Sequence, residues 1–232
     1  MRFPSRLLAA NMWFAVMLWA GYLVLVTVIT LAVELFGELN QSAWEQATQL
    51  PRWYAFFTGV TLVRQFLPLY IAHGQTRREF GAQAAVTVAL FAPFLSALIT
   101  ISYLLETALY GLLDRPQVIS QAHLFTEPTQ VPLVFAEYLL EFLVWIIGGS
   151  FIGAGFYRWG AGGLLTIPVG ILLAVLAETA TGGELRLPLL RVIDLNLSPS
   201  AAMTAGVGIG AFVLGLALTW PLIRDVPLRN KA

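Results

Sequence analysis

Residues 7 to 33 form a run without a single charged side chain. A helix of about 20 apolar residues crosses the hydrocarbon core of a bilayer, so this run is long enough for one span. The whole chain has this character, because 58% of its 232 residues are hydrophobic and only 11% are charged. A soluble domain carries about 25% charged residues and avoids large apolar patches. The sequence therefore predicts an all-α, polytopic membrane protein.

The same composition excludes several other classes of protein. Disorder is excluded because so much apolar surface requires burial. Thirteen basic and 13 acidic residues leave no net charge, so we expect no nucleic-acid partner. Cysteine is absent, which rules out disulfides, thiol nucleophiles and zinc thiolate sites.

Hydropathy divides the chain into six candidate spans joined by short loops. The first is longer than the apolar core of a signal peptide, about 7–15 residues, and we interpret it as a permanent anchor. What remains outside the spans is too short for a soluble domain, so residues 1–232 are predicted to form a single transmembrane domain. The predicted spans are 12–33, 53–72, 80–105, 131–155, 161–177 and 201–223.

Basic residues indicate the orientation of these spans. Loops on the cytoplasmic side are enriched in lysine and arginine. An even number of spans places both termini on one side, and eight of the 13 basic residues lie there, which predicts cytoplasmic termini. These eight are Arg2, Arg6, Arg77, Arg78, Arg158, Arg224, Arg229 and Lys231.

The nucleotide and metal motifs are missing. A Walker loop requires Gly-Lys-Ser/Thr, and the only lysine, Lys231, is followed by alanine. Gly206-x-Gly208-x-x-Ala211 matches the dinucleotide fingerprint by letter but lies inside an apolar span. The two histidines, His73 and His123, fall on opposite sides of the membrane, and His123 with Glu127 is interpreted as a surface pair. No resident cofactor, no metal site and no enzymatic activity are expected.

Three charged residues lie inside predicted spans, where each costs about 2.5–3.5 kcal/mol. They are Arg64, Glu137 and Glu141. Counted from the outer ends of their spans at about 1.5 Å per residue, Arg64 and Glu141 reach the same depth. Glu137 shares a helix face with Glu141. We predict that Arg64 pairs with Glu141 or with both glutamates, either as a structural ion pair or as the polar lining of a substrate pathway or a proton site.

Small residues and the N-terminus add two further expectations. Gly149 and Gly153, like Gly206 and Gly210, have the four-residue spacing of close helix contacts in membranes. These contacts are expected within the bundle or between two subunits. At the N-terminus, Arg2 and Arg6 lie opposite the apolar Phe3, Leu7 and Leu8. This pattern predicts either an amphipathic helix over residues 3–10 on the inner surface or a simple basic flank of the first span.

Three local patterns resemble the small six-span permeases of the ABC type-2 exporters, the membrane subunits of bacterial ATP-driven exporters. The first is the inner loop Gly74-Gln75-Thr76-Arg77-Arg78-Glu79-Phe80, similar to the family's Gly-x-Ser/Thr-Arg-Arg-x-Phe turn between spans two and three. The others are Tyr103-Leu104-Leu105-Glu106, which closes the third span, and the segment from Gly148 to Gly153 followed by Tyr157-Arg158-Trp159-Gly160.

The resemblance implies a dimer of permeases around a central pathway in the bacterial inner membrane. Separate ABC ATPase subunits, which bind ATP and Mg²⁺, would dock on residues 74–80 and on the N-terminal helix. Residues 179–199 would cap the exit. The bilayer and a second permease copy, identical or not, are the other partners expected.

Two other classes fit the sequence. One is an ion-coupled secondary transporter that uses Arg64, Glu137 and Glu141, although the chain shows no repeated halves. The other is a membrane protein that transports nothing, such as an immunity or assembly factor. An intramembrane enzyme fits least, because no catalytic set of residues is visible at a common depth.

Overall fold

The computed structural model describes residues 5–37, 39, 41–181 and 200–224. All regular elements in these residues are helical, which confirms the predicted all-α class. They are α1 (Ser5–Phe36), α2 (Ala43–Ala47), α3 (Gln49–Thr61), the π-helical η1 (Leu62–Phe66), α4 (Leu67–Ala72), α5 (Arg77–Leu112), α6 (Val131–Trp159), the 3₁₀ helix η2 (Gly160–Thr166), α7 (Ile167–Thr181) and α8 (Ala201–Arg224).

Five stretches of the described chain are long and apolar enough to cross a membrane, as in a multi-pass membrane protein. The spans predicted at 131–155 and 161–177 fall in a single apolar stretch of 48 residues, and α7 alone has 15 residues. A sixth crossing therefore stays a prediction. The stretches are Asn11–Phe36, Ala43–Ala72, Arg77–Leu112, Val131–Glu178 and Ala201–Arg224.

The longest apolar stretch folds back on itself. Gly160 follows α6 with φ of 60°, a backbone conformation that glycine adopts without strain. The chain then returns along α6, and a Cβ on Gly148 would lie 2.9 Å from the carbonyl oxygen of Gly170. The close approach requires glycine at both positions, so α6 and α7 form an antiparallel hairpin.

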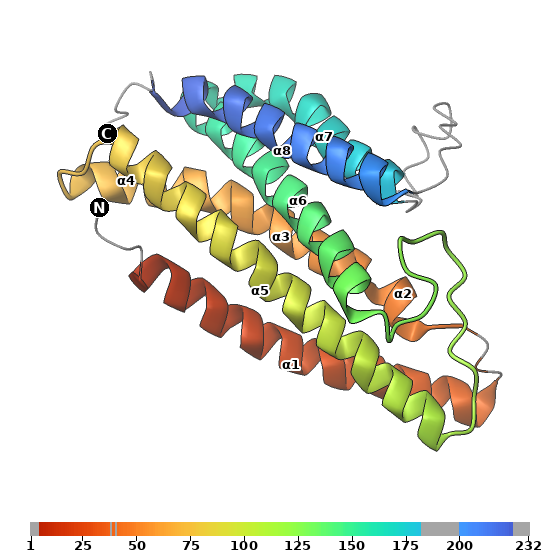
Figure 1. The fold of residues 1–232 in the computed structure, drawn as a ribbon. Coiled ribbons are helices and arrows are strands. Elements are labelled where there is room, and N and C mark those ends of the chain that lie inside the picture. Colours follow the sequence, from red (N-terminus) through yellow and green to blue (C-terminus); the bar gives the residue numbers. More distant parts are fainter. Residues whose placement is uncertain (1–4, 38, 40, 182–199, 225–232) are drawn as a thin grey trace.

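The helices alternate in direction, so turns gather at two ends of the bundle (Figure 1). At one end lie the start of α1, the α4–α5 turn, the α6–α7 turn and the end of α8. There Arg158 donates a hydrogen bond to the carbonyl of Pro221, at 3.1 Å, and Gly81 packs under the ring of Trp220. We name this the arginine end, for Arg77, Arg78, Arg158 and Arg224.

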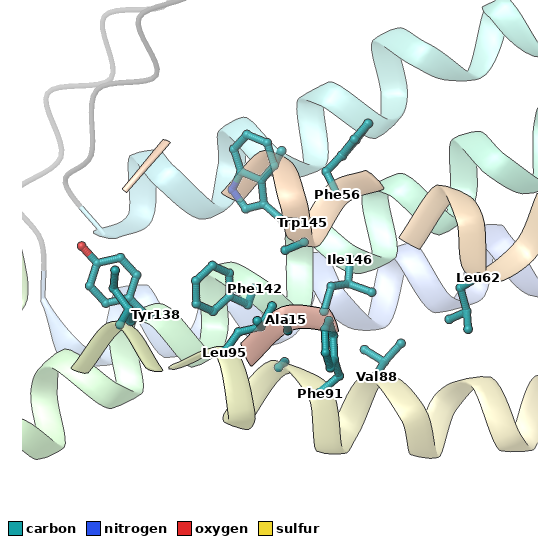
Figure 2. Packing of buried hydrophobic residues seen from close by; sticks show 14 of the residues in the cluster. Ala15, Phe56, Leu62, Val88, Phe91, Leu95, Tyr138, Phe142, Trp145 and Ile146 are labelled. Carbon is teal, nitrogen blue, oxygen red and sulfur yellow. The ribbon is translucent and has the colours of Figure 1, made fainter. Parts of the chain in front are cut away.

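Helix α6 is the centre of the fold. It packs against α3, α5, α7 and α8, and residues 144–155 are buried without interruption. A helix that is apolar on all sides needs such cover on all sides. Figure 2 shows the core that results, in which Phe142, Trp145 and Ile146 of α6 meet side chains from α3 and α5.

Helix α1 lies at the edge of the bundle and packs against α5 and α2 (Figure 1). It is continuous from Ser5, so residues 5–10 are its first turns and not a separate surface helix, while residues 3 and 4 lie outside the described residues. Most of its apolar side chains are exposed, as expected for a helix that faces lipid. They include Trp13, Phe14, Met17, Val24, Leu25, Val28, Ile29 and Phe36.

The helix of the second predicted span is interrupted at η1. Pro68 has no backbone N–H, so the carbonyl of Arg64, four residues earlier, loses its usual helical partner. A single π turn over Leu62–Phe66 absorbs this break, and the helix resumes as α4. The π turn also changes the direction in which Arg64 points relative to α3.

Candidate functional site

The candidate site is a buried ionic network at the end of the bundle opposite the arginine end. Arg52 is one member of this network, and it lies on the face of α3 that packs against α6. Its side chain is 3% exposed, and two of its nitrogens contact the Glu141 carboxylate at 2.9 and 3.2 Å. A third nitrogen contacts Glu178 of α7 at 2.9 Å. One guanidinium therefore joins α3, α6 and α7.

Hydrogen bonds around Arg52 are unequally shared between the two carboxylates. The Thr181 hydroxyl donates to Glu141 at 2.8 Å, in addition to the two bonds from Arg52. Glu178 receives only a long contact of 3.4 Å from the Gln49 amide besides Arg52. Its second oxygen, Oε2, is buried and has no hydrogen-bond partner.

A second cluster is centred on His123, in the segment between α5 and α6. Its Nδ1 lies 2.6 Å from Glu137, and its Nε2 lies 3.5 Å from Glu45. The ring stacks on Phe125 at 4.6 Å between centroids, and the side chain is 2% exposed. The backbone N–H of Leu124 donates to the other Glu137 oxygen at 2.7 Å. The segment is thus held over the bundle by two carboxylates.

Two further buried carboxylates complete the network. Glu45 accepts hydrogen bonds from the backbone N–H groups of Ser120 and Gln121, at 2.6–3.0 Å. Glu106 accepts one from the Ser42 hydroxyl at 2.6 Å and others from the backbone at the start of α2. These bonds replace the water that each carboxylate loses on burial.

Counted together, the network contains more acid than base. Four buried carboxyl groups contact the two cationic side chains, Arg52 and His123, and Glu106 is a fifth buried carboxyl group at the same end of the bundle. The four are on Glu45, Glu137, Glu141 and Glu178. An isolated buried charge costs several kcal/mol unless it is paired or changes its protonation state. The arrangement is able to join helices tightly and to bind protons.

The His123 imidazole is charged at neutral pH. Burial by itself would lower its pKa, but the hydrogen bond to Glu137, the contact with Glu45 and the nearby carboxylate charges outweigh burial and raise the pKa from 6.5 to about 9. Because the folded pKa exceeds the unfolded one, the stabilisation is complete below about pH 6.5 and is lost as the pH rises through about 9.

Stability should therefore fall by about 3 kcal/mol between about pH 6.5 and 9. Thermal unfolding of purified protein across this range measures the effect. His123→Gln is expected to unfold at lower temperature near pH 6 and to lack most of the pH-dependent decline. Equal declines in the two proteins would show that His123 is not responsible.

The predicted pair of Arg64 with Glu141 is wrong. Arg64 is exposed, and Glu141 is paired with Arg52. The buried face of α3 and η1 contains positions 52, 55, 56, 59, 62 and 63, and Arg64 lies one residue past that face. Depth along the membrane normal was therefore an insufficient criterion, since helix register decides which side chains meet. The helical spacing of 52 with Ala55, Phe56 and Gly59 was the available signal.

The predicted surface pair of His123 with Glu127 is also wrong. His123 contacts Glu137 and Glu45, and Glu127 is exposed. Glu137 is buried, as predicted for a charge inside a span, but its partner is His123 from the segment between α5 and α6. Glu45, Glu106 and Glu178 lie outside the predicted spans, in the loops that the predicted topology places away from the termini, and all three are buried. The gathering of acidic residues in those predicted loops was the available signal for an acidic cluster.

The inner loop at 74–80 is a tight turn fixed at both ends. Gly74 has φ of 76°, and Thr76 caps α5 in a reciprocal capping box with Glu79, in which Thr76 N–H donates to Glu79 at 2.8 Å. Phe80 is fully buried against the Tyr70 ring. Gln75, Arg77 and Arg78 occupy the remaining positions, and Arg78 is exposed at the arginine end.

The predicted glycine pairs lie in different surroundings. A Cβ on Gly149 would collide with the Phe56 carbonyl of α3, and one on Gly153 would lie 2.7 Å from the Val60 carbonyl. Those two glycines therefore bring α6 against α3 within the bundle. Gly206 and Gly210 are exposed on α8 and have open space around them. The apolar outer segment 179–199 lies, from residue 182 on, outside the described residues.

In the part of the chain that the structure describes, no group of three histidine or acidic residues is arranged to hold a metal ion. Comparisons with family models, curated proteins and solved structures each found no match.

Proposed function

We propose that this chain is the permease subunit of an ATP-binding-cassette exporter in a bacterial inner membrane. Two copies would form the pathway, and separate ATPase subunits would bind ATP and Mg²⁺. In this proposal α6 and α7 each cross the membrane, which gives six spans and two cytoplasmic termini. The chain itself would catalyse no reaction.

The construction of the α4–α5 turn carries the proposal. A partner that drives transport must push on an element firmly joined to long helices. The capping box, Gly74 and the buried Phe80 join this turn to both α4 and α5. Helix α5 then extends over 36 residues, about 54 Å, to the opposite end of the bundle. Displacement of the turn would reach the ionic network through Glu106 of α5.

The positions of the arginines support an orientation in which the α4–α5 turn faces the cytoplasm. Arg77, Arg78, Arg158 and Arg224 gather at the end where the turn lies, and the buried carboxylates gather at the other. Short basic loops face the cytoplasm, which is where an ATPase would bind. The exposed guanidinium of Arg78 is suited to acidic side chains on such a partner.

The packing supports a pathway between two copies. Within the described chain, the cavity between α1, α3, α5 and α6 has almost wholly apolar walls. It offers a polar substrate few hydrogen-bond partners. A second copy would supply the other wall of a path, and the open faces of Gly206 and Gly210 allow close approach of its helices. The cavity is lined by Asn11, Thr58, Leu62, Phe66, Thr87, Val88, Phe91 and Ile146.

Changing Arg77 and Arg78 to glutamate should remove a co-purifying ATPase from the protein. Like charges at the contact repel and lower affinity by several kcal/mol, which is a loss of a hundredfold or more. Affinity purification from native membranes followed by mass spectrometry measures it. Arg115→Glu, at the opposite end, is the matched control and should retain the ATPase. An unchanged ATPase yield in the double variant would contradict the docking role of this turn.

A second candidate is an ion-coupled carrier, and the observation in its favour is the excess of buried carboxyl groups around Arg52 and His123. In such a carrier, Arg52 would take the role predicted for Arg64, together with Glu137, Glu141 and Glu178. Uptake or export by vesicles that contain this chain without any ATPase would favour the carrier over the permease.

A further inference from the structure

We propose that the Arg52–Glu141–Glu178 triad is a proton-binding site in which Glu178 carries the proton. The proton adds to a carboxylate oxygen of Glu178, comes from water at the outer end of the bundle and returns to it. This inference concerns the triad alone and does not depend on the exporter proposal.

The charges of Arg52, Glu141 and Glu178 favour one proton on the triad. Both carboxyl side chains are completely buried and share one guanidinium, whose own exposure is 3%. With both glutamates ionised, the triad would have an uncompensated negative charge inside the bundle. Two carboxyl groups sharing one site avoid this by retaining one proton.

One oxygen of Glu178 has no hydrogen-bond partner, which also favours a proton on this residue. Glu178 Oε2 is buried and receives no hydrogen bond, while its Oε1 contacts Arg52 at 2.9 Å. An ionised carboxylate oxygen that is buried without a donor carries the full cost of its lost hydration, whereas protonation removes the charge and most of that cost. The missing donor at Oε2 therefore favours the protonated form of Glu178.

Donor counts assign the proton to Glu178 and not to Glu141. Glu141 receives two bonds from Arg52 and one from the Thr181 hydroxyl, and this set stabilises its negative charge. Glu178 receives one bond from Arg52 and a long one from Gln49. The better-solvated carboxylate stays ionised.

No other charged group among the described residues contacts Glu178. Helix α3 contributes Arg52 and the uncharged Gln49, and α6 contributes Glu141, with Tyr138 close enough to influence Arg52. Glu137, one turn from Glu141, is occupied by His123. On the α8 side, the nearby Thr204 hydroxyl donates to the Ala180 carbonyl.

A proton also fits the space available. The triad side chains are buried against one another, and no metal-binding group is found among the residues that the structure describes. A metal ion or organic cation would need room and several oxygen ligands, but a proton needs neither. Gln49, half-buried at the start of α3, separates Glu178 from the outer end of the bundle.

Infrared spectroscopy tests the assignment on the whole protein, purified without an ATPase. At neutral pH the carbonyl band of a protonated carboxyl group is expected in the wild type, absent in Glu178→Gln and retained in Glu137→Gln. A band that survives in Glu178→Gln, or no band in the wild type, would overturn the proposal.

Thermal unfolding gives an independent reading. Glu178→Gln is isosteric with the protonated acid and should unfold within about 2 °C of the wild type. Glu141→Gln removes the ionised partner of Arg52 and should unfold at least about 6 °C lower. The reverse order, including failure of Glu178→Gln to fold, would show that Glu178 is ionised.

Discussion

Arg52→Leu is expected to lower the free energy of unfolding by about 3–5 kcal/mol, because it leaves the carboxyl groups of Glu141 and Glu178 buried without a cation. Unfolding of purified protein in detergent measures the change. Arg115→Leu is the control. It breaks an ion pair with Glu34 whose arginine side chain is 48% exposed, and it should cost about 1 kcal/mol or less.

The double variant Arg52→Leu with Glu141→Leu should recover much of that loss. It removes the ionised carboxylate together with its partner, so that a neutral Glu178 remains. Arg64→Leu should be tolerated, because Arg64 is exposed and lies outside the buried face of α3 and η1. If Arg52→Leu were as stable as Arg115→Leu, the buried ionic network would have no structural role.

Gly149→Val should destabilise the protein by about 3 kcal/mol or more. Its Cβ would occupy the place of the Phe56 carbonyl, and the backbone of α3 cannot rotate away as a flexible side chain would. The helices must therefore separate. Gly21→Val in α1 is the matched control, since nothing lies within 4 Å of its added Cβ, and it should change stability by less than about 0.5 kcal/mol.

The unfolding temperatures of both glycine variants measure how much the packing of α3 against α6 depends on Gly149. An unchanged unfolding temperature for Gly149→Val would mean that α3 and α6 do not pack through this face.

Hydropathy predicted most of the fold because a membrane span is a local property of the sequence. Helices α1, α5 and α8 each contain a long uncharged run, at 7–33, 80–105 and 201–223, so their existence followed from counting. The boundaries were less predictable. Val131–Glu178 contains two helical directions within one apolar stretch, and only the reversal at Gly160 separates them.

The ionic network was less visible because its members are far apart in sequence. Arg52 and Glu141 are separated by 89 residues, and Arg52 precedes the apolar run of its own span. A charge at that position looks like an interfacial flank. Its burial depends on the packing of α3, α6 and α7, which no local pattern determines.

The motif at 74–80 illustrates why the resemblance needs testing. Gly74, Thr76, Glu79 and Phe80 each have a local role in the turn: positive φ, helix capping and core packing. The turn's geometry accounts for these four residue types whether or not an ATPase binds. Arg77 and Arg78 are the part of the motif that the turn geometry does not require.

The composition of the complex purified from native membranes tests the central claim most directly. If the proposed function is right, that complex contains two copies of this chain with two P-loop ATPase subunits, and it transports in an ATP-dependent way after reconstitution. Purified protein without any ATPase that still transports substrate, driven by an ion gradient alone, would contradict it.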